Sequence, residues 1–113
     1  MSQYLLLSYL PADYQPDPAE IKAEYPKWQQ FDQAIKDAGI FLSNAGLKGA
    51  DMATTVRVRD GEMQLTDGPF AETKEYLAGY WLIEVDDLDA AVGWASKMPS
   101  SERGSVEVRP VWG

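Results

Sequence analysis

Apolar positions along the chain follow two different periods, and each period indicates a kind of secondary structure. Residues 4–9, YLLLSY, and residues 79–85, GYWLIEV, are apolar on both alternating faces, which is typical of strands buried on both sides. Between residues 17 and 39, apolar side chains recur at helical spacing, namely Ile21, Tyr25, Trp28, Ile35 and Ala38. The pattern therefore predicts two buried strands and one amphipathic helix.

The ends of this helix carry recognisable capping residues. Asp17 offers an N-cap carboxylate, Pro18 occupies the first helical position, and Glu20 follows three residues after the cap. Gly39 stands where a C-terminal cap belongs. Pro26 lies inside the pattern and removes one backbone donor, so we expect either a kink or a restart of the helix there.

Residues 54–66, TTVRVRDGEMQLT, predict a hairpin whose two-residue turn is Asp60-Gly61. That turn fixes the register, so the facing pairs are Arg59 with Glu62, Val58 with Met63, Arg57 with Gln64 and Val56 with Leu65. The four apolar residues then share one face of the hairpin, and the four polar residues share the other.

The last third of the chain predicts a second helix and a final strand. Asp86 or Asp87 supplies the N-cap, and Leu88, Ala91, Val92 and Ala95 line one side of the helix. A loop over residues 99–104 leads to SVEVRPVW, where Pro110 suits an edge strand or a strand end. Residues 39–53 are interpreted as a connection that contains a short apolar segment, IFL.

In chain order these elements are strand, helix, hairpin, strand, helix and strand, all within a single domain of residues 1–113. This order predicts a ferredoxin-like α+β fold, with two helices on one face of a mostly antiparallel sheet and an additional hairpin strand. The two strands that are apolar on both faces would be central. Because the helices cover only one face, we expect a second copy of the chain to cover the other as a two-fold homodimer, unless residues 39–53 cover part of it.

Composition limits the partners and the chemistry. The chain has 113 residues, and 18 acidic against 10 basic residues give a net charge of −8, which disfavours nucleic acid and membranes as partners. The start MSQYLLLSYLP has no basic region before its short apolar run, so we expect a cytoplasmic protein. Without Cys or His, thiolate nucleophiles, Ser-His triads and the usual zinc or haem ligands are excluded.

Neither a phosphate-binding glycine loop nor a dinucleotide fingerprint is present, and the acidic cluster 86–89 lacks the ligand spacing of a calcium loop. We therefore expect no cofactor and no metal. Any acid or base acting near neutral pH would be a carboxylate or a lysine with a shifted pKa.

Four stretches, TTVRVRDG, TDGPFAETKE, GYWLIEVDDLDAAVGWASKMP and SVEVRPV, together resemble the DGPF group of YCII-related domain proteins. The resemblance covers essentially the whole chain and implies a mostly bacterial, dimeric, ferredoxin-like protein of the dimeric α/β-barrel type. Most members have no established activity, and some are encoded beside extracytoplasmic-function sigma factors. One branch of the superfamily includes a dehydrochlorinase with a proposed His-Asp pair, whereas this chain has no His and has Trp28 where many relatives carry His or Tyr.

The first candidate site residue is Asp67, in the stretch TDGPFAETKE. As a structural residue it would cap the Phe70 N–H in a turn that Gly68 permits and Pro69 fixes, with Phe70 in the core and AETKEYL as a short helical turn. As a functional residue it would be an acid, a base or a substrate anchor at the edge of a pocket.

The remaining candidates, for binding a small organic ligand, are Trp28, Arg57, Pro69, Phe70 and Tyr80. The aromatic residues either pack in the core or form the wall of a pocket for a planar ligand. Arg57, like Arg59, Glu107 and Arg109, is solvated, pairs across a dimer interface, or binds an anion. Glu72, Lys74 and Glu75 are interpreted as exposed charges at helical spacing.

Two function hypotheses follow from the sequence. The first is a small-molecule binding protein or cofactor-free enzyme with a pocket near the DGPF segment. The second is a non-catalytic interaction module associated with sigma-factor-type transcriptional regulation.

Overall fold

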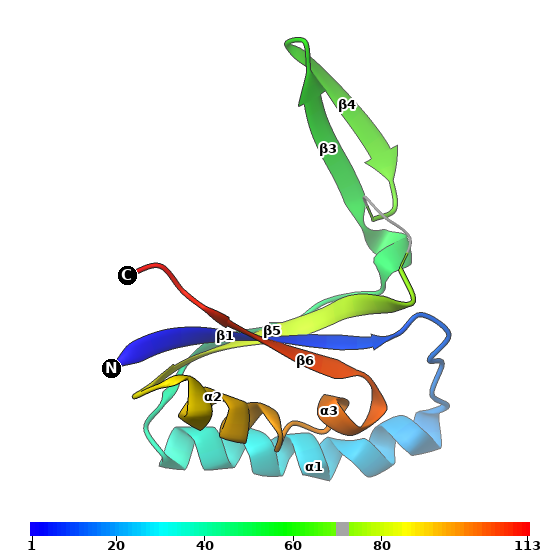
Figure 1. Cartoon of the computed structure of the whole chain (residues 1–113). Helices are drawn as coiled ribbons and strands as arrows, with labels where there is room; N and C mark the ends of the chain where they lie inside the picture. Colours follow the sequence, from blue (N-terminus) through cyan, green and yellow to red (C-terminus); the bar gives the residue numbers. More distant parts are fainter. Residues whose placement is uncertain (70–72) are drawn as a thin grey trace.

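The computed structural model describes residues 1–69 and 73–113 (Figure 1). Its elements, in chain order, are β1 (Ser2–Pro11), α1 (Pro18–Asp37), β2 (Phe41–Gly46), the 3₁₀ turn η1 (Ala50–Met52), β3 (Thr54–Arg59), β4 (Glu62–Asp67), β5 (Glu75–Val85), α2 (Leu88–Ala95), α3 (Ser100–Arg103) and β6 (Ser105–Pro110). The result is an α+β architecture compatible with a ferredoxin-like fold, as the order of predicted elements indicated.

The main sheet has the strand order β2-β5-β1-β6, and its neighbouring strands are antiparallel. The two strands predicted to be central, β1 and β5, are central and form the longest ladder, in which Leu6 faces Trp81 and Leu7 faces Tyr80. β6 forms one edge and ends at Pro110, which confirms the position expected for a residue that cannot donate to a ladder.

α1, α2 and α3 all lie on the same face of this sheet (Figure 1). Between them and the sheet lies the core, whose fully buried side chains include Leu6, Ile35, Ile83 and Met98. The opposite face, called here the open face, carries Leu5, Leu7, Tyr9, Tyr80 and Leu82, all half-buried. Successive side chains of a strand point to opposite faces of the sheet. Because Leu6 and Ile83 point into the core, their neighbours in the strands point to the open face.

α1 begins as predicted, since the side chain of Asp17 accepts a hydrogen bond from the Glu20 N–H at 2.8 Å. The helix continues through Pro26, so the expected restart does not occur. Its predicted apolar stripe is wrong in its first half, because Ile21 and Tyr25 are 57% and 63% exposed. Phe31, which was not in the predicted stripe, is buried in the core.

Residues 39–53 contain a strand rather than only a connection. β2 pairs with β5 at the edge of the main sheet, and the Ile40 carbonyl accepts a hydrogen bond from the Glu84 N–H at 2.9 Å. β2 thereby takes the sheet position that the sequence left to an additional hairpin strand. Because β2 extends the sheet sideways, it does not cover the open face.

The hairpin β3–β4 has the predicted register, with Val58 facing Met63 and Arg59 facing Glu62. Asp60 and Gly61 both have positive φ, 53° and 77°, as the two central residues of a type I′ turn require. The hairpin does not join the main sheet, however, and forms a two-stranded sheet of its own. It rises from the side of the main sheet that faces away from the helices (Figure 1).

The C-terminal elements match the prediction in their order and differ in detail. Asp87 caps α2 by accepting a hydrogen bond from the Ala90 N–H at 2.9 Å, while the predicted stripe is only half buried, because Leu88 and Val92 are exposed. The predicted loop over residues 99–104 contains the short helix α3, whose Arg103 pairs with Glu24 of α1.

The stretch TDGPFAETKE ends one hairpin and begins the next strand. Asp67 is the last residue of β4, and β5 starts at Glu75, earlier than the predicted strand at residue 79. The predicted helical turn over AETKEYL is therefore wrong for residues 75–77, which belong to β5. Phe70, predicted to fill the core, and Glu72 lie outside the described residues.

Candidate functional site

The predicted site residues lie in three separate parts of the chain. Trp28 is on α1, on the helix side of the main sheet, whereas Tyr80 is on the open face. Arg57 and Asp67 belong to the hairpin, and Pro69 follows it. Within one chain the fold therefore does not gather Trp28 and Tyr80 into the same pocket.

Trp28 is part of an aromatic cluster at the edge of the core. Its indole stacks on that of Trp81, with ring centres 5.0 Å apart and planes 10° from parallel, and Phe31 meets both rings edge to face. The Trp81 Nε1–H donates to Asp32 Oδ1 at 3.1 Å, so the polar end of the half-buried indole has a charged acceptor. These contacts fix α1 on β5 and are those of a packed core.

Asp67, Gly68 and Pro69 close the base of the hairpin. The Gly68 N–H donates to the Ala53 carbonyl at 2.6 Å, and the Thr55 hydroxyl donates to the Gly68 carbonyl at 2.8 Å. Gly68 has a φ of 96°, a left-handed conformation that glycine adopts without strain, as the predicted turn requires. Asp67 faces Thr54 and is exposed, while its predicted cap on Phe70 lies outside the described residues.

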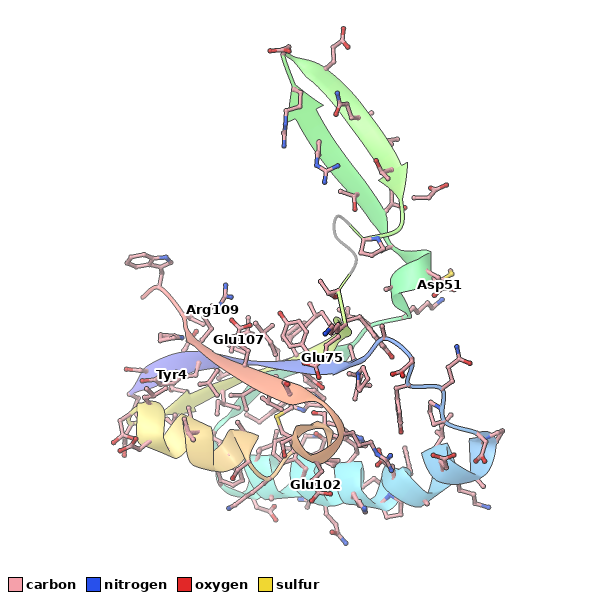
Figure 2. The ribbon with its side chains drawn as sticks, turned by 45° about the vertical axis from the view of Figure 1, so that its right-hand side comes forward. Tyr4, Asp51, Glu75, Glu102, Glu107 and Arg109 are labelled. Carbon is pink, nitrogen blue, oxygen red and sulfur yellow. The ribbon has the colours of Figure 1, made fainter. Side chains whose placement is uncertain are left out.

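A hollow of about 500 Å³ lies beside the continuation of this stretch. Its lining comes from β1, from the start of β5 and from the edge strand β6, and consists of Tyr9, Thr73, Lys74, Glu75, Ser105, Val106 and Glu107. Glu75 and Glu107 are labelled in Figure 2, on the side of the sheet that faces away from the helices. The hollow therefore opens on the open face, a few residues along the chain from Asp67.

Two hydrogen bonds hold the polar groups of this hollow in place. The Ser105 hydroxyl donates to Glu75 Oε1 at 2.9 Å, and the Thr73 hydroxyl donates to the Glu75 carbonyl oxygen. The ladders position both partners, because Glu75 faces Pro11 and Ser105 faces Tyr9 on the two sides of β1. Glu75 is half-buried, so it is not one of the exposed helical charges expected from the sequence.

The charges around the hollow are mixed. Lys74 supplies one cation, while Glu75 and Glu107 supply two carboxylates, of which Glu107 forms an ion pair with Arg109 on the same strand. Together with the hydroxyls of Tyr9 and Ser105, these groups offer both donors and acceptors to a small polar molecule. With no His in the chain, the groups of this hollow with acid–base chemistry are its two carboxylates and the Lys74 amine.

A second hollow, of about 340 Å³, lies on the helix side. It is lined by Lys27, Gln30, Phe31, Ala34, Lys97, Pro99 and Glu102, between α1 and the segment that leads into α3. None of the predicted site residues takes part in it. Across residues 1–69 and 73–113, the fold gathers no group of three acidic side chains that could hold a metal ion. Over the same residues, no helix is long and apolar enough to cross a membrane.

The residues of the open-face hollow were missed because their proximity depends on strand pairing. Tyr9, Glu75 and Ser105 come from three segments far apart in the sequence. Glu75 and Ser105 belong to stretches that carry the family resemblance, but no local pattern shows that these segments meet. Asp32 was missed for a similar reason, since its partner Trp81 is 49 residues away. The available signal was the alternation of Val106 and Val108 with Glu107 and Arg109 in β6, which puts the two charged side chains on the face away from the core.

Fold and site define a small α+β protein whose described helices cover one face of an antiparallel sheet. The chain belongs to the family of YCII-related domain proteins, whose model matches residues 1–113. It is also similar to an uncharacterised protein of Rhizobium meliloti (strain 1021), with 42% identity over 77 residues. That match covers 66% of this chain and 62% of the relative's length.

Proposed function

We propose that this protein binds a small polar organic molecule in the open-face hollow, next to residues 73–75. The observation that carries the proposal is the Ser105–Glu75 hydrogen bond, which holds an exposed hydroxyl and a half-buried carboxylate together in a shallow, open hollow of about 500 Å³. Hollows of roughly 300–1,000 Å³ with a few fixed polar groups are typical of small-molecule sites. The motif Asp67-Gly68-Pro69-Phe70 supports placing the chain in the DGPF group of the family.

The ligand chemistry follows from the lining. Two carboxylates, three hydroxyls and one ammonium group favour a molecule with hydroxyl or amino donors over a multiply charged anion. If the site also catalyses a reaction, Glu75 is the group that would accept or donate a proton at the ligand. Asp67 is a second candidate for an acid, base or anchor, because it precedes the same segment of chain.

The proposed functional unit is a homodimer. Leu5, Leu7, Tyr80 and Leu82 leave a continuous apolar strip on the open face, and the described residues of the chain do not cover it (Figure 1). A second copy stacked on this face would bury the strip and close the hollow from above, which would exclude water from the ligand.

The proposal is tested by an amide NMR titration with a library of small alcohols, amines, phenols and carboxylates. We expect shifts at Tyr9, Thr73 to Glu75 and Ser105, and a loss of at least tenfold in affinity in Glu75→Gln, which removes the charge. Glu102→Gln is the matched control, because it removes a carboxylate from the helix-side hollow. Equal affinity in both variants, or shifts confined to the helix side, would contradict the proposal.

Asp67→Asn separates the two roles of Asp67 in the same titration. Asn also caps turns, so the variant should fold as the wild type does, and its ligand affinity falls only if the Asp67 carboxylate acts on the ligand.

A non-catalytic interaction module, acting with a sigma-factor-type regulator, is the second candidate function. The exposed apolar face of the hairpin favours it, since such surfaces are typical of protein contacts. A titration without any shifts around the hollow would favour this second function over the first.

A further inference from the structure

The hairpin β3–β4 exposes the largest cluster of apolar side chains on any one element described. Val56, Val58, Met63 and Leu65 are 56%, 60%, 66% and 61% exposed, and the register places them together as facing pairs on one side of the hairpin. A two-stranded hairpin that packs against nothing is only marginally stable in water. This hairpin therefore requires a cover that residues 1–69 and 73–113 of its own chain do not provide.

The position of the hairpin indicates where that cover lies. The hairpin stands away from the main sheet on the same side as the open face, as both views show (Figures 1 and 2). A body that sits on the open face would therefore lie beside the hairpin. One partner can then cover both the open face and the apolar side of the hairpin.

We infer that the hairpin is an arm that packs its apolar side against a second copy of this chain stacked on the open face. This inference rests on the proposed homodimer and adds the part of the interface that the main sheet does not contain. In a two-fold arrangement each protomer supplies one arm and one open face, so both apolar surfaces of both copies are covered at once.

The area that a stable dimer requires supports this assignment. The four strands of the sheet are spaced about 4.8 Å apart; β1 and β5 are about 35 Å long and β2 and β6 about 20 Å, which gives a sheet face of roughly 500 Å². A standard interface buries about 800 Å² on each partner, so the sheet face alone supplies somewhat more than half. The apolar side chains of the arm add further apolar area to the interface.

The length of the arm fits as well. Each strand of the hairpin has six residues and extends about 20 Å, whereas face-to-face sheets stack about 10 Å apart. An arm of that length reaches past the sheet of a stacked copy.

The test replaces the apolar pair of the arm that lies nearest the turn, without weakening the hairpin itself. Val58→Lys with Met63→Glu places opposite charges at directly facing positions, so the cross-strand pair and the net charge of −8 are both kept. The matched control exchanges the facing pair on the other side of the hairpin, Arg59→Glu with Glu62→Arg. Sedimentation equilibrium gives the dimer dissociation constant of each variant.

We expect the Val58/Met63 variant to dimerise about 100-fold more weakly than the wild type, and the control within about threefold. If the Val58/Met63 variant dimerises as tightly as the wild type, the arm has no role in the interface, while the homodimer itself stands. A wild type that is monomeric at high concentration would overturn both. Ligand binding in the hollow is read separately by the titration, so the failures are distinguishable.

A second readout does not depend on breaking the dimer. Because the chain has no Cys, Val58→Cys accepts a single environment-sensitive fluorophore, and Gln64→Cys places the same label on the polar side. We expect the emission of the Val58 label alone to shift to the blue as the protein concentration rises through the dissociation constant. Equal behaviour of the two labels would overturn the inference.

Discussion

The two faces of the main sheet differ in how completely the chain covers them. On the helix side, Leu6, Ile35 and Ile83 are fully buried, and the indole of Trp81 finds both a stacking partner and an acceptor for its N–H. On the open face, residues with the same hydrophobicity, such as Leu7 and Leu82, are only half-buried. The described residues pack a complete core on the helix side and leave the apolar side chains of the open face half-buried.

This difference shows that an apolar pattern predicts that a side chain is buried but does not identify the element that covers it. β1 alternates between the two faces, so Leu6 and Leu7 are adjacent in the chain, equal in chemistry and opposite in surroundings. Selection for solubility alone would place polar residues at positions 5, 7 and 82. Their hydrophobicity supports the proposal that a second copy of the chain covers this surface.

The largest expected effect comes from truncating these two neighbours. Leu6→Ala should lower the free energy of unfolding by about 3 kcal/mol, because it opens a cavity in a fully buried core. Leu7→Ala should cost about 1 kcal/mol in the monomer, since the side chain is already half exposed to water. Urea unfolding of both variants, followed by tryptophan fluorescence, measures the difference.

Protein concentration sharpens the comparison. If a second copy covers the open face, the cost of Leu7→Ala should rise with protein concentration, because dimerisation adds to the stability of the wild type. The cost of Leu6→Ala should stay nearly constant. A Leu7→Ala cost that does not change over a hundredfold range of concentration would argue against a covered open face.

The sequence predicted the parts of the fold that depend on local chemistry. The caps at Asp17 and Asp87, the turn at Asp60-Gly61 and the full hairpin register are confirmed, because each depends on residues a few positions apart. The central position of β1 and β5 is also confirmed, since strands that are apolar on both faces have neighbours on both sides.

The sequence failed where tertiary contacts override local signals. β2 is a short edge strand, FLSNAG, without strong β-propensity, and its pairing with β5 across the hairpin insertion decides its structure. Ile21 and Tyr25 have the right helical spacing, yet they lie on a part of α1 that no described element covers. The residues of the open-face hollow converge through pairing with β1, which no local pattern reveals.

A smaller effect is expected from the charged acceptor of the helix-side cluster. Asp32→Ala should lower the free energy of unfolding by about 1–2 kcal/mol, because the Trp81 N–H loses its partner in a half-buried site. Asp32→Asn keeps an acceptor oxygen and should cost less. Asp37→Ala is the control on the same helix, since its partner Gln33 is exposed.

Asp32→Ala should leave ligand binding on the open face unchanged, because α1 lies on the other side of the sheet. Loss of ligand affinity in a folded Asp32→Ala protein would mean that the two sides of the sheet are coupled.

The smallest expected effect lies in the turn of the hairpin. Gly61 has a φ of 77°, so Gly61→Ala should cost the hairpin about 1 kcal/mol in backbone strain. In the monomer the hairpin stands apart from the core, so the global free energy of unfolding should hardly change while amides of residues 54–67 exchange about fivefold faster. Gly46→Ala, at a strand position with open space around a new Cβ, is the control. Hydrogen exchange read by NMR measures the effect. An equal loss of amide protection in hairpin and core would show that the hairpin unfolds together with the main sheet. If slow exchange of the hairpin amides returns on dimerisation, the second copy is what stabilises the hairpin.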